Sequence, residues 1–168
     1  MTISMHSASV PIFVRTLGNM LSWLDKAEAH AKAKNFDPDN YLGLRLTPDM
    51  LPFSRQIQIA SDACKRCLSG LAGLEAPTWE DDEATLDELR ARIVKTIDYA
   101  QSVPAEKIDG SEEREITLPI PNGELKFPGE TFLKSFSLPN FFFHCTMTYA
   151  LLRQGGVDLG KMDYLGAP

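Results

Sequence analysis

The feature that most constrains the fold is a run of apolar residues spaced alternately four and three apart. Six residues between positions 53 and 71 follow this spacing: Phe53, Ile57, Ala60, Cys64, Cys67 and Leu71. Residues spaced in this way lie on one face of an α-helix, and such a stripe is typical of helices that pack in bundles. Gly70 and Gly73 indicate where this helix ends. We therefore expect a mainly helical chain.

Three further segments are predicted to be helices. Apolar residues at helical spacing cover residues 9–34, and a second such face follows the capping box Thr85-Leu-Asp-Glu88 as far as Pro104. The last helix covers residues 131–154 and contains Pro139, which either kinks it or begins its second part. Because this second part is apolar nearly all round, we expect it to be the most buried helix of the four.

A short β-hairpin is predicted before the last helix. Ile116, Leu118 and Ile120 alternate with other residues, and Asn122-Gly123 indicates a turn. A two-stranded ribbon has little stability alone, so we expect it to lie against the bundle as a lid. The tail, residues 157–165, carries enough apolar side chains to pack back onto the body.

Charge and hydropathy exclude several classes of function. The formal net charge of −6 argues against a nucleic-acid surface, because such binding depends on Lys and Arg neutralising phosphates. The longest apolar run, residues 141–152, is shorter than the roughly 20 residues that a membrane helix needs. Residues 1–9 lack the basic head and apolar stretch of a signal peptide. We expect one cytosolic domain, residues 1–168, that binds neither nucleic acid nor membranes.

The three cysteines are expected to be small buried apolar residues. Cys64 and Cys67 lie three apart within a helix, whereas a redox CxxC works at a strand-to-helix turn. No second CxxC and no pair of histidines accompanies them, so a zinc site is not indicated. Cys145 adjoins His144, but adjacent helical residues point about 100° apart and do not readily share a proton.

The best candidate site surrounds His144, since it alone among the three histidines is expected within the bundle. Five residues of the last helix share its face: Asn140, His144, Met147, Thr148 and Leu151. A buried imidazole can bind a metal, move a proton or simply form a hydrogen bond with a neighbour, and the last of these is the commonest. Gln56 or Gln58 is the candidate neighbour on the second helix.

The other polar residues are assigned to the surface. His6 and His30 lie among polar residues near the ends of the first helix and are expected to be solvated. Arg55 and Arg153 would bind an anionic ligand if they reached a cleft, although salt-paired surface arginines are commoner. An ordinary helix-surface charge cluster is expected for Asp62, Lys65 and Arg66.

Two sequence segments resemble an uncharacterised bacterial and fungal family of unknown function. They are Pro139-Asn-Phe-Phe-Phe-His144 and Leu151-Leu-Arg-Gln-Gly-Gly-Val-Asp-Leu-Gly-Lys161-Met-Asp-Tyr-Leu-Gly166. Arg45-Leu-Thr-Pro-Asp-Met50 with Gln56 extends the resemblance over nearly the whole chain. The family is similar to a distant branch of the DinB-like superfamily. The resemblance implies a DinB-like four-helix bundle with a long crossover between helices two and three, and often a homodimer.

The resemblance also implies where a metal site would lie. Many DinB-like proteins hold a divalent metal with three histidines, two of them four apart on the last helix and one near the start of the second. The resemblance puts His144 on the second of the paired ligands, Asn140 on the first and Gln56 near the third. One imidazole and two amides bind zinc or nickel weakly, so we expect no metal or other cofactor, and any metal would depend on His144.

Three hypotheses of function follow. The first is a non-catalytic or small-ligand-binding bundle with a polar cluster of Gln56, Asn140, His144 and Thr148 in place of the metal site. The second is a divalent-metal-dependent enzyme of the thiol-transferase or hydrolase type that uses His144. The third is a homodimeric interaction module without a small-molecule site. The sequence names no substrate, and whether the protein is an enzyme stays open.

Overall fold

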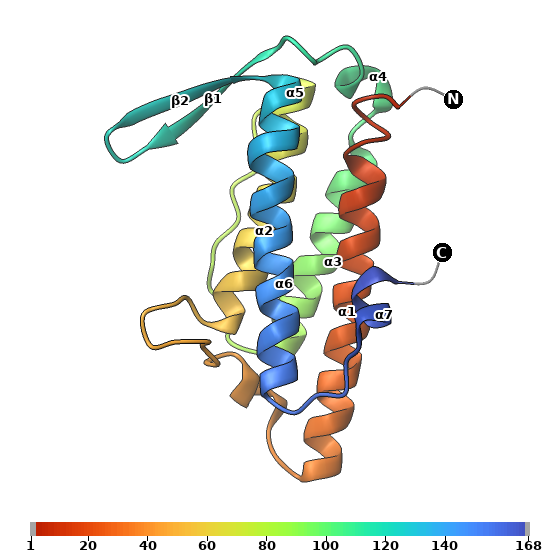
Figure 1. The fold of residues 1–168 in the computed structure, drawn as a ribbon, viewed down its shortest axis with the longest axis vertical. Coiled ribbons are helices and arrows are strands. Elements are labelled where there is room, and N and C mark those ends of the chain that lie inside the picture. Colours follow the sequence, from red (N-terminus) through yellow and green to blue (C-terminus); the bar gives the residue numbers. More distant parts are fainter. Residues whose placement is uncertain (1–2, 167–168) are drawn as a thin grey trace.

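The computed structural model describes residues 3–166 and shows a mainly helical protein built on four long helices (Figure 1). Residues 1–2 and 167–168 lie outside the described residues. The predictions about the N-terminus and about the single domain include these residues. The long helices are α1 (Val10–Lys34), α2 (Phe53–Ala72), α3 (Leu86–Ser102) and α6 (Leu138–Gln154). The shorter helical segments of the described residues are η1 (Pro38–Tyr41), α4 (Ala105–Ile108), α5 (Gly129–Thr131), η2 (Phe132–Ser137) and α7 (Lys161–Leu165).

The long connection between α2 and α3 gives the bundle its topology. Residues 73–85 run back along the bundle, so that α3 begins near the level at which α2 begins and runs parallel to it (Figure 1). Helix α2 packs against α6 and α3, and α1 packs against α3 and α6. The expected four-helix bundle with a long crossover between the second and third helices is confirmed.

Two helix ends show how local sequence sets the boundaries. At the start of α3, Thr85 Oγ1 accepts a hydrogen bond from the Glu88 amide, and the Glu88 carboxylate accepts one from the Thr85 amide, as the capping box predicts. Helix α2 ends at Gly73, which has a φ of 65°. Gly70 lies inside α2, and a Cβ there would meet Ile116 at 3.2 Å. The prediction that Gly70 ends the helix was therefore wrong. The absence of a side chain at Gly70 instead lets Ile116 of the hairpin pack closely against α2.

The hairpin consists of β1 (Glu115–Ile120) and β2 (Gly123–Pro128), paired antiparallel with Glu115 opposite Pro128 and Ile120 opposite Gly123. It extends sideways from one end of the bundle (Figure 1). Ile116 is its buried side chain and packs against α2 at Gly70. Most of the remaining hairpin is exposed or half-buried, so it is anchored mainly at its base.

A π-helical segment, η2 (Phe132–Ser137), leads from α5 into α6. The amide of Leu138 donates to the carbonyl of Leu133, five residues earlier. Pro139 lies in the first turn of α6, where its missing N–H costs little, so it begins the second part of the last helix.

Helix α2, and not α6, is the most buried long helix. Buried side chains occur on nearly every face of α2, which packs between α3 and α6. Phe143 on α6 is 52% exposed, and Thr146 is exposed as well. The expectation based on the apolar composition of residues 140–154 was wrong, because α6 has helices on one side only and leaves aromatic residues on the other.

The C-terminal tail packs on α1, as expected. Val157 and Leu159 are buried. In α7, the carbonyl of Asp163 accepts a hydrogen bond from Trp23 Nε1 at 2.9 Å, and the ring of Tyr164 stacks on the indole with centroids 5.5 Å apart. Among residues 3–166 no helix is both long and apolar enough to cross a membrane.

The cysteines are buried and unpaired, as predicted. Burial raises the pKa of Cys64 well above its usual value, raises the pKa of Cys67 to about 12 and raises that of Cys145 further. A thiol whose pKa is raised in this way stays protonated near neutral pH and is a poor nucleophile. These side chains belong to the core.

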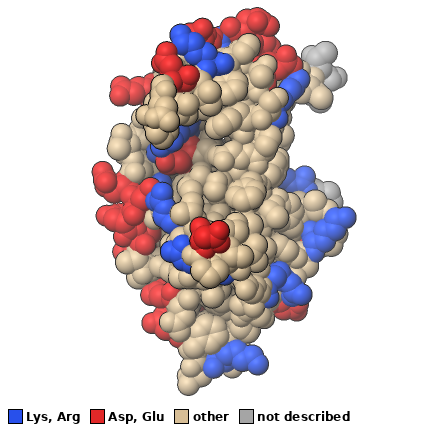
Figure 2. Space-filling model, turned by 60° about the vertical axis from the view of Figure 1, so that its left-hand side comes forward, with Lys and Arg blue, Asp and Glu red and all other residues tan. Residues whose placement is uncertain are grey.

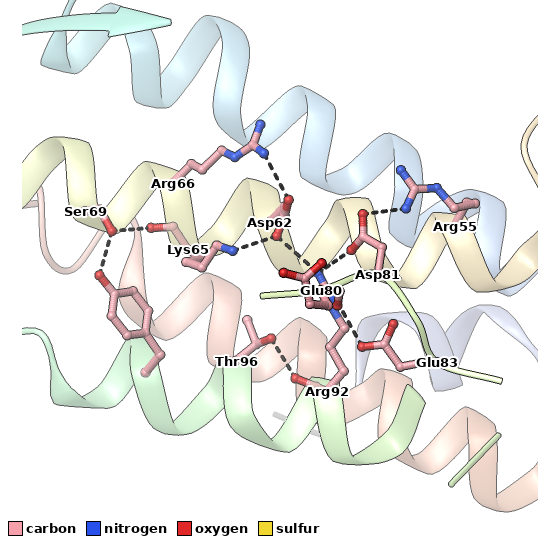
Figure 3. A network of polar contacts seen from close by, with 11 residues as sticks. Arg55, Asp62, Lys65, Arg66, Ser69, Glu80, Asp81, Glu83, Arg92 and Thr96 are labelled. Atoms are coloured by element: carbon pink, nitrogen blue, oxygen red, sulfur yellow. Dashed lines mark hydrogen bonds and ion pairs between the residues drawn. The ribbon is translucent and has the colours of Figure 1, made fainter. Parts of the chain in front are cut away.

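A cluster of charged residues ties the crossover to α2 and α3 (Figure 3). The side chain of Arg92 on α3 is only 2% exposed. Its Nη2 lies 2.9 Å from Asp81 and 3.2 Å from Asp62, and its Nη1 lies 2.9 Å from Glu83. Its Nη1 also donates to the Glu80 carbonyl at 2.7 Å. Because Asp81 and Glu83 belong to the crossover, this one guanidinium holds the crossover against the helices.

The same cluster includes residues that were expected at the surface. Asp62 also contacts Lys65 at 2.9 Å and Arg66 at 3.1 Å. The side chain of Lys65 is 4% exposed, and its ammonium lies 4.4 Å from the centre of the Trp79 ring. The prediction of an ordinary helix-surface charge cluster was therefore wrong. We call the following set the Arg92 network: Arg55, Asp62, Lys65, Arg66, Asp81, Glu83 and Arg92.

Replacing Arg92 by Met is expected to lower the free energy of unfolding by about 3 kcal/mol, because it leaves partly buried carboxylates without their shared cation. Urea denaturation measures this loss. Arg90 is a matched control on the same helix, since its partners Asp25 and Glu28 are well exposed. Arg90→Met is expected to cost less than about 1 kcal/mol. Equal losses for the two variants would contradict a stabilising role for the Arg92 network.

Candidate functional site

His144 and Gln56 form a buried polar pair between α6 and α2. His144 is 8% exposed, and Gln56 is almost fully buried. The imidazole Nδ1 lies 2.8 Å from Gln56 Oε1, while Gln56 Nε2 donates to the carbonyl of Leu51 at 2.9 Å. Because the Leu51 bond fixes which end of the amide faces the ring, Nδ1 carries the proton and Nε2 carries the lone pair.

The environment of His144 favours its neutral form. Burial lowers the pKa of His144 below its usual value. Its orienting partner is an amide, which holds the ring but supplies no negative charge to stabilise an imidazolium. Across residues 3–166, Nε2 makes no hydrogen bond to another side chain. The pair thus offers a hydrogen-bond acceptor and lacks the carboxylate that supports general-base catalysis.

The structure places the other residues of the predicted polar cluster differently. Thr148 is buried one turn after His144, and its hydroxyl donates to the His144 carbonyl at 2.9 Å. Asn140, one turn before, forms no hydrogen bond with His144 or Gln56 within the described part of the chain, and instead lines a cleft. The structure therefore joins Gln56 to His144 and leaves the Asn140 side chain facing other neighbours.

Of the two glutamines considered as partners of His144, Gln56 is the one that meets it. Gln58 is also buried, but it donates to Glu83 at 2.7 Å and accepts from Arg55 at 2.7 Å. It therefore extends the Arg92 network.

The two remaining histidines are half-buried. His30 Nδ1 lies 2.6 Å from the hydroxyl of Tyr41 in η1. The amide of His6 donates to the Asp109 carboxylate at 2.8 Å, so the backbone at His6 is tied to the segment after α4. The expectation that the imidazole is simply solvated was wrong for His30, whose ring bonds Tyr41, and stays a prediction for His6, of which the structure shows a partner for the backbone amide.

A cleft of about 310 Å³ lies between α2, the crossover, the hairpin and the start of α6. The surface is hollowed on the face shown in Figure 2, with charged side chains along one side of the hollow and uncharged residues along the other. The lining residues are Arg55, Ile59, Asp62, Ala63, Arg66, Asp81, Leu118, Pro119, Ile120, Phe132, Phe136, Ser137 and Asn140.

The cleft combines an apolar wall with a few polar groups, as small-molecule sites do. The sequence left open whether Arg55 and Arg153 reach a cleft. Arg55 lines this one. Arg153 does not line it, is half exposed and lies 3.9 Å from Asp158. Sequence reasoning missed Phe132 and Phe136 as lining residues. The alternation of Leu118 and Ile120 predicted the strand that forms another part of the lining, but it did not predict which helix the hairpin faces.

The donor atoms near His144 do not fit the three-histidine metal site that the resemblance implies. One imidazole is present, its Nδ1 is bonded to the Gln56 amide, and Asn140 lines the cleft instead. Zinc and nickel prefer nitrogen and sulfur donors, so a single imidazole with amides is a poor ligand set. Among residues 3–166 no group of three or more His, Cys, Asp or Glu side chains is placed to hold a metal ion.

Comparison with known proteins confirms the family and the fold. Residues 5–165 match the family described as "Domain of unknown function (DUF1993)", and the chain belongs to this family. A crystal structure of a DinB family member protein from Shewanella denitrificans is similar, with a TM-score of 0.89 and 36% sequence identity over 97% of this chain and 92% of that chain. No curated protein matches the chain. The DinB-like fold expected from the sequence is thus shown, and these relatives assign no specific function.

The lowered pKa of His144 predicts that stability falls as the pH drops below about 6.5, its usual value. The unfolded chain binds a proton there that the folded chain resists, so this part of the stability is present above the unfolded pKa and is lost as pH falls through the folded pKa. NMR titration of the imidazole is expected to give a pKa below 6.5. His144→Asn is expected to reduce the fall in melting temperature between pH 7 and pH 5. A titration at or above 6.5 would contradict this account.

Proposed function

We propose that this DUF1993 protein is a non-catalytic, cytosolic, single-domain bundle that binds a small ligand in the cleft lined by Asn140. The observation that carries the proposal is the cleft itself. It joins an apolar wall from the hairpin and η2 to charged groups on α2 and the Asn140 amide on α6. Its volume of about 310 Å³ lies at the lower end of the range, roughly 300–1,000 Å³, in which ligand pockets fall.

In this proposal the four residues of the predicted cluster have two roles. Asn140 contacts the ligand, because it is the member that lines the cleft. The bond from His144 to Gln56 holds α6, the helix that carries Asn140, against α2, and Thr148 supports His144 from within α6 through its bond to the His144 carbonyl. A buried hydrogen bond such as the one between the two helices contributes about 1 kcal/mol.

The charged groups in the cleft favour binding over catalysis. Burial raises the pKa of Asp81, but the hydrogen bond and charge of Arg55 and the charge of Arg92 outweigh it, and the pKa lies below its usual value. Asp62 contacts three cations. A carboxyl whose pKa is lowered, as that of Asp81 is, is a poor general acid and a poor base near neutral pH. The cleft therefore offers recognition groups.

A fragment screen tests whether the cleft binds ligands. In NMR spectra of the ¹⁵N-labelled protein, fragments that bind are expected to shift amides of residues 55–66 and 132–140. Asn140→Leu is expected to weaken such binding about tenfold, the effect of losing one hydrogen bond with its partner left unpaired. Gln154→Leu, an exposed position on the same helix, is the control and is expected to change nothing. Shifts confined to other surfaces, or none, would contradict the proposal.

We also propose that the protein forms a homodimer. Phe143 is 52% exposed, and its ring lies edge-on to that of His144 with centroids 5.2 Å apart. Leu51, whose carbonyl holds the Gln56 amide, is 45% exposed. Two large apolar side chains thus flank the polar pair on its outer side. Burying such residues against a second copy would remove apolar area from water at about 25 cal/mol per Å².

Sedimentation velocity at micromolar concentration tests this assembly. The parent protein is expected to sediment as a dimer and Phe143→Glu as a folded monomer, because a charge at the centre of an apolar contact has to be desolvated. The control Val94→Glu changes an exposed apolar residue on α3 and is expected to remain dimeric. A monomeric parent protein would overturn the proposal of a homodimer.

A further inference from the structure

The charged side of the cleft is lined by two arginines, Arg55 and Arg66, and two carboxylates, Asp62 and Asp81. In the Arg92 network the basic residues are Arg55, Lys65, Arg66 and Arg92, and the carboxylates are Asp62, Asp81 and Glu83 (Figure 3). Four cations therefore share three carboxylates. Glu80 takes part through its backbone carbonyl. The network is short of one negative charge.

The two arginines that line the cleft share their carboxylates with other cations. Asp62 is shared by three cations and Asp81 by two, so each outer arginine receives only part of a carboxylate. Arg66 is 61% exposed and uses a single nitrogen, Nη2, in its bond with Asp62 at 3.1 Å. A guanidinium carries five N–H donors, and a planar acid group suits two of them at once. Arg66 therefore has donors left for an anion.

The opposite side of the cleft is suited to a hydrocarbon chain. Ile59 and Ala63 of α2 form its floor, and Leu118, Ile120 and Phe136 stand over them. Ile120 and Phe136 are each more than a third exposed, although they are large apolar residues next to a cleft. Covering them would contribute about 25 cal/mol for each Å² of apolar surface removed from water. A ligand that fits both sides is small, apolar at one end and singly anionic at the other.

We propose that the cleft takes a small amphipathic monocarboxylate, with its carboxylate on Arg66 and its hydrocarbon part between Ile59, Phe136 and the hairpin. This inference rests on the proposed function, which it deepens by assigning the class of ligand. Asn140 donates its amide N–H to the same carboxylate from the α6 side. A single carboxylate uses the donors that Arg66 leaves free, whereas a dianion such as a phosphate monoester brings a second negative charge against Asp62 and Asp81, which line the same cleft.

Three eight-carbon molecules with different polar groups separate the contribution of charge from that of the hydrocarbon: octanoate, 1-octanol and octylammonium. Calorimetry, together with NMR shifts of the cleft amides, gives the affinity of each. Octanoate is expected to bind about tenfold more tightly than 1-octanol, the effect of one charge-assisted hydrogen bond, and octylammonium is expected to be the weakest. Equal affinities for octanoate and 1-octanol would overturn the assignment of a carboxylate.

Variants locate the contact. Arg66→Gln is expected to weaken octanoate about tenfold and to leave 1-octanol unchanged, and it is expected to fold because Arg66 forms only a well-exposed ion pair. Ile120→Asn is expected to weaken both molecules alike. Arg153→Gln removes an exposed arginine of α6 that does not line the cleft and is the control. Octanoate binding that is insensitive to Arg66→Gln would overturn the proposed contact.

The experiment also distinguishes the failure of this inference from that of the proposed function. If octanoate fails to bind at up to about 10 mM while other fragments shift amides of the cleft, the carboxylate assignment is overturned and the cleft remains a ligand site. If neither octanoate nor any fragment shifts those amides, both proposals are overturned. Octanoate shifts that appear only on other surfaces, such as the region of α7, count against the inference in the same way.

Discussion

The guanidinium of Arg92 is the point at which three separate parts of the chain meet. A buried guanidinium is stable only when carboxylates surround it, so α2 supplies Asp62 and the crossover supplies Asp81 and Glu83. This requirement holds a long irregular segment in one place between two parallel helices. Trp79, carried by the same segment, then lies against the Lys65 ammonium. The topology of the bundle and the charged side of the cleft both depend on this one interaction.

Local sequence was enough to predict the helices, because the signals for them act over one or two turns. The spacing of Phe53 to Leu71 and the capping box at Thr85 each predicted an element that the structure contains. The Arg92 network was not predictable in this way. Its members are up to 37 positions apart, from Arg55 to Arg92, and periodicity alone gives Asp62, Lys65 and Arg66 the pattern of a solvated helix face. Burial of charge depends on what tertiary packing brings against it.

The candidate site was predicted in part. Helical spacing and the family resemblance placed Gln56 beside His144, and the structure joins them. Asn140 was expected in the same cluster because it lies one turn away. In the structure Gln56 bonds the His144 ring and the Leu51 carbonyl, while Asn140 lines the cleft and takes no part in the pair. The cleft itself depends on where the hairpin lies, and no local pattern determines that position.

The π-helical segment before α6 sets the rotation of α6 about its own axis. An α-helix turns by about 100° per residue, so winding one extra residue into a turn rotates everything that follows by that angle. Residues 132–137 therefore decide which side chains of α6 point at α2. A homologue lacking one residue there would keep a helix of the same length and apolar content while bringing a neighbour of His144 to face Gln56. A single-residue insertion or deletion in this segment would thus exchange the side chains at the centre of the bundle while the four helices keep their places.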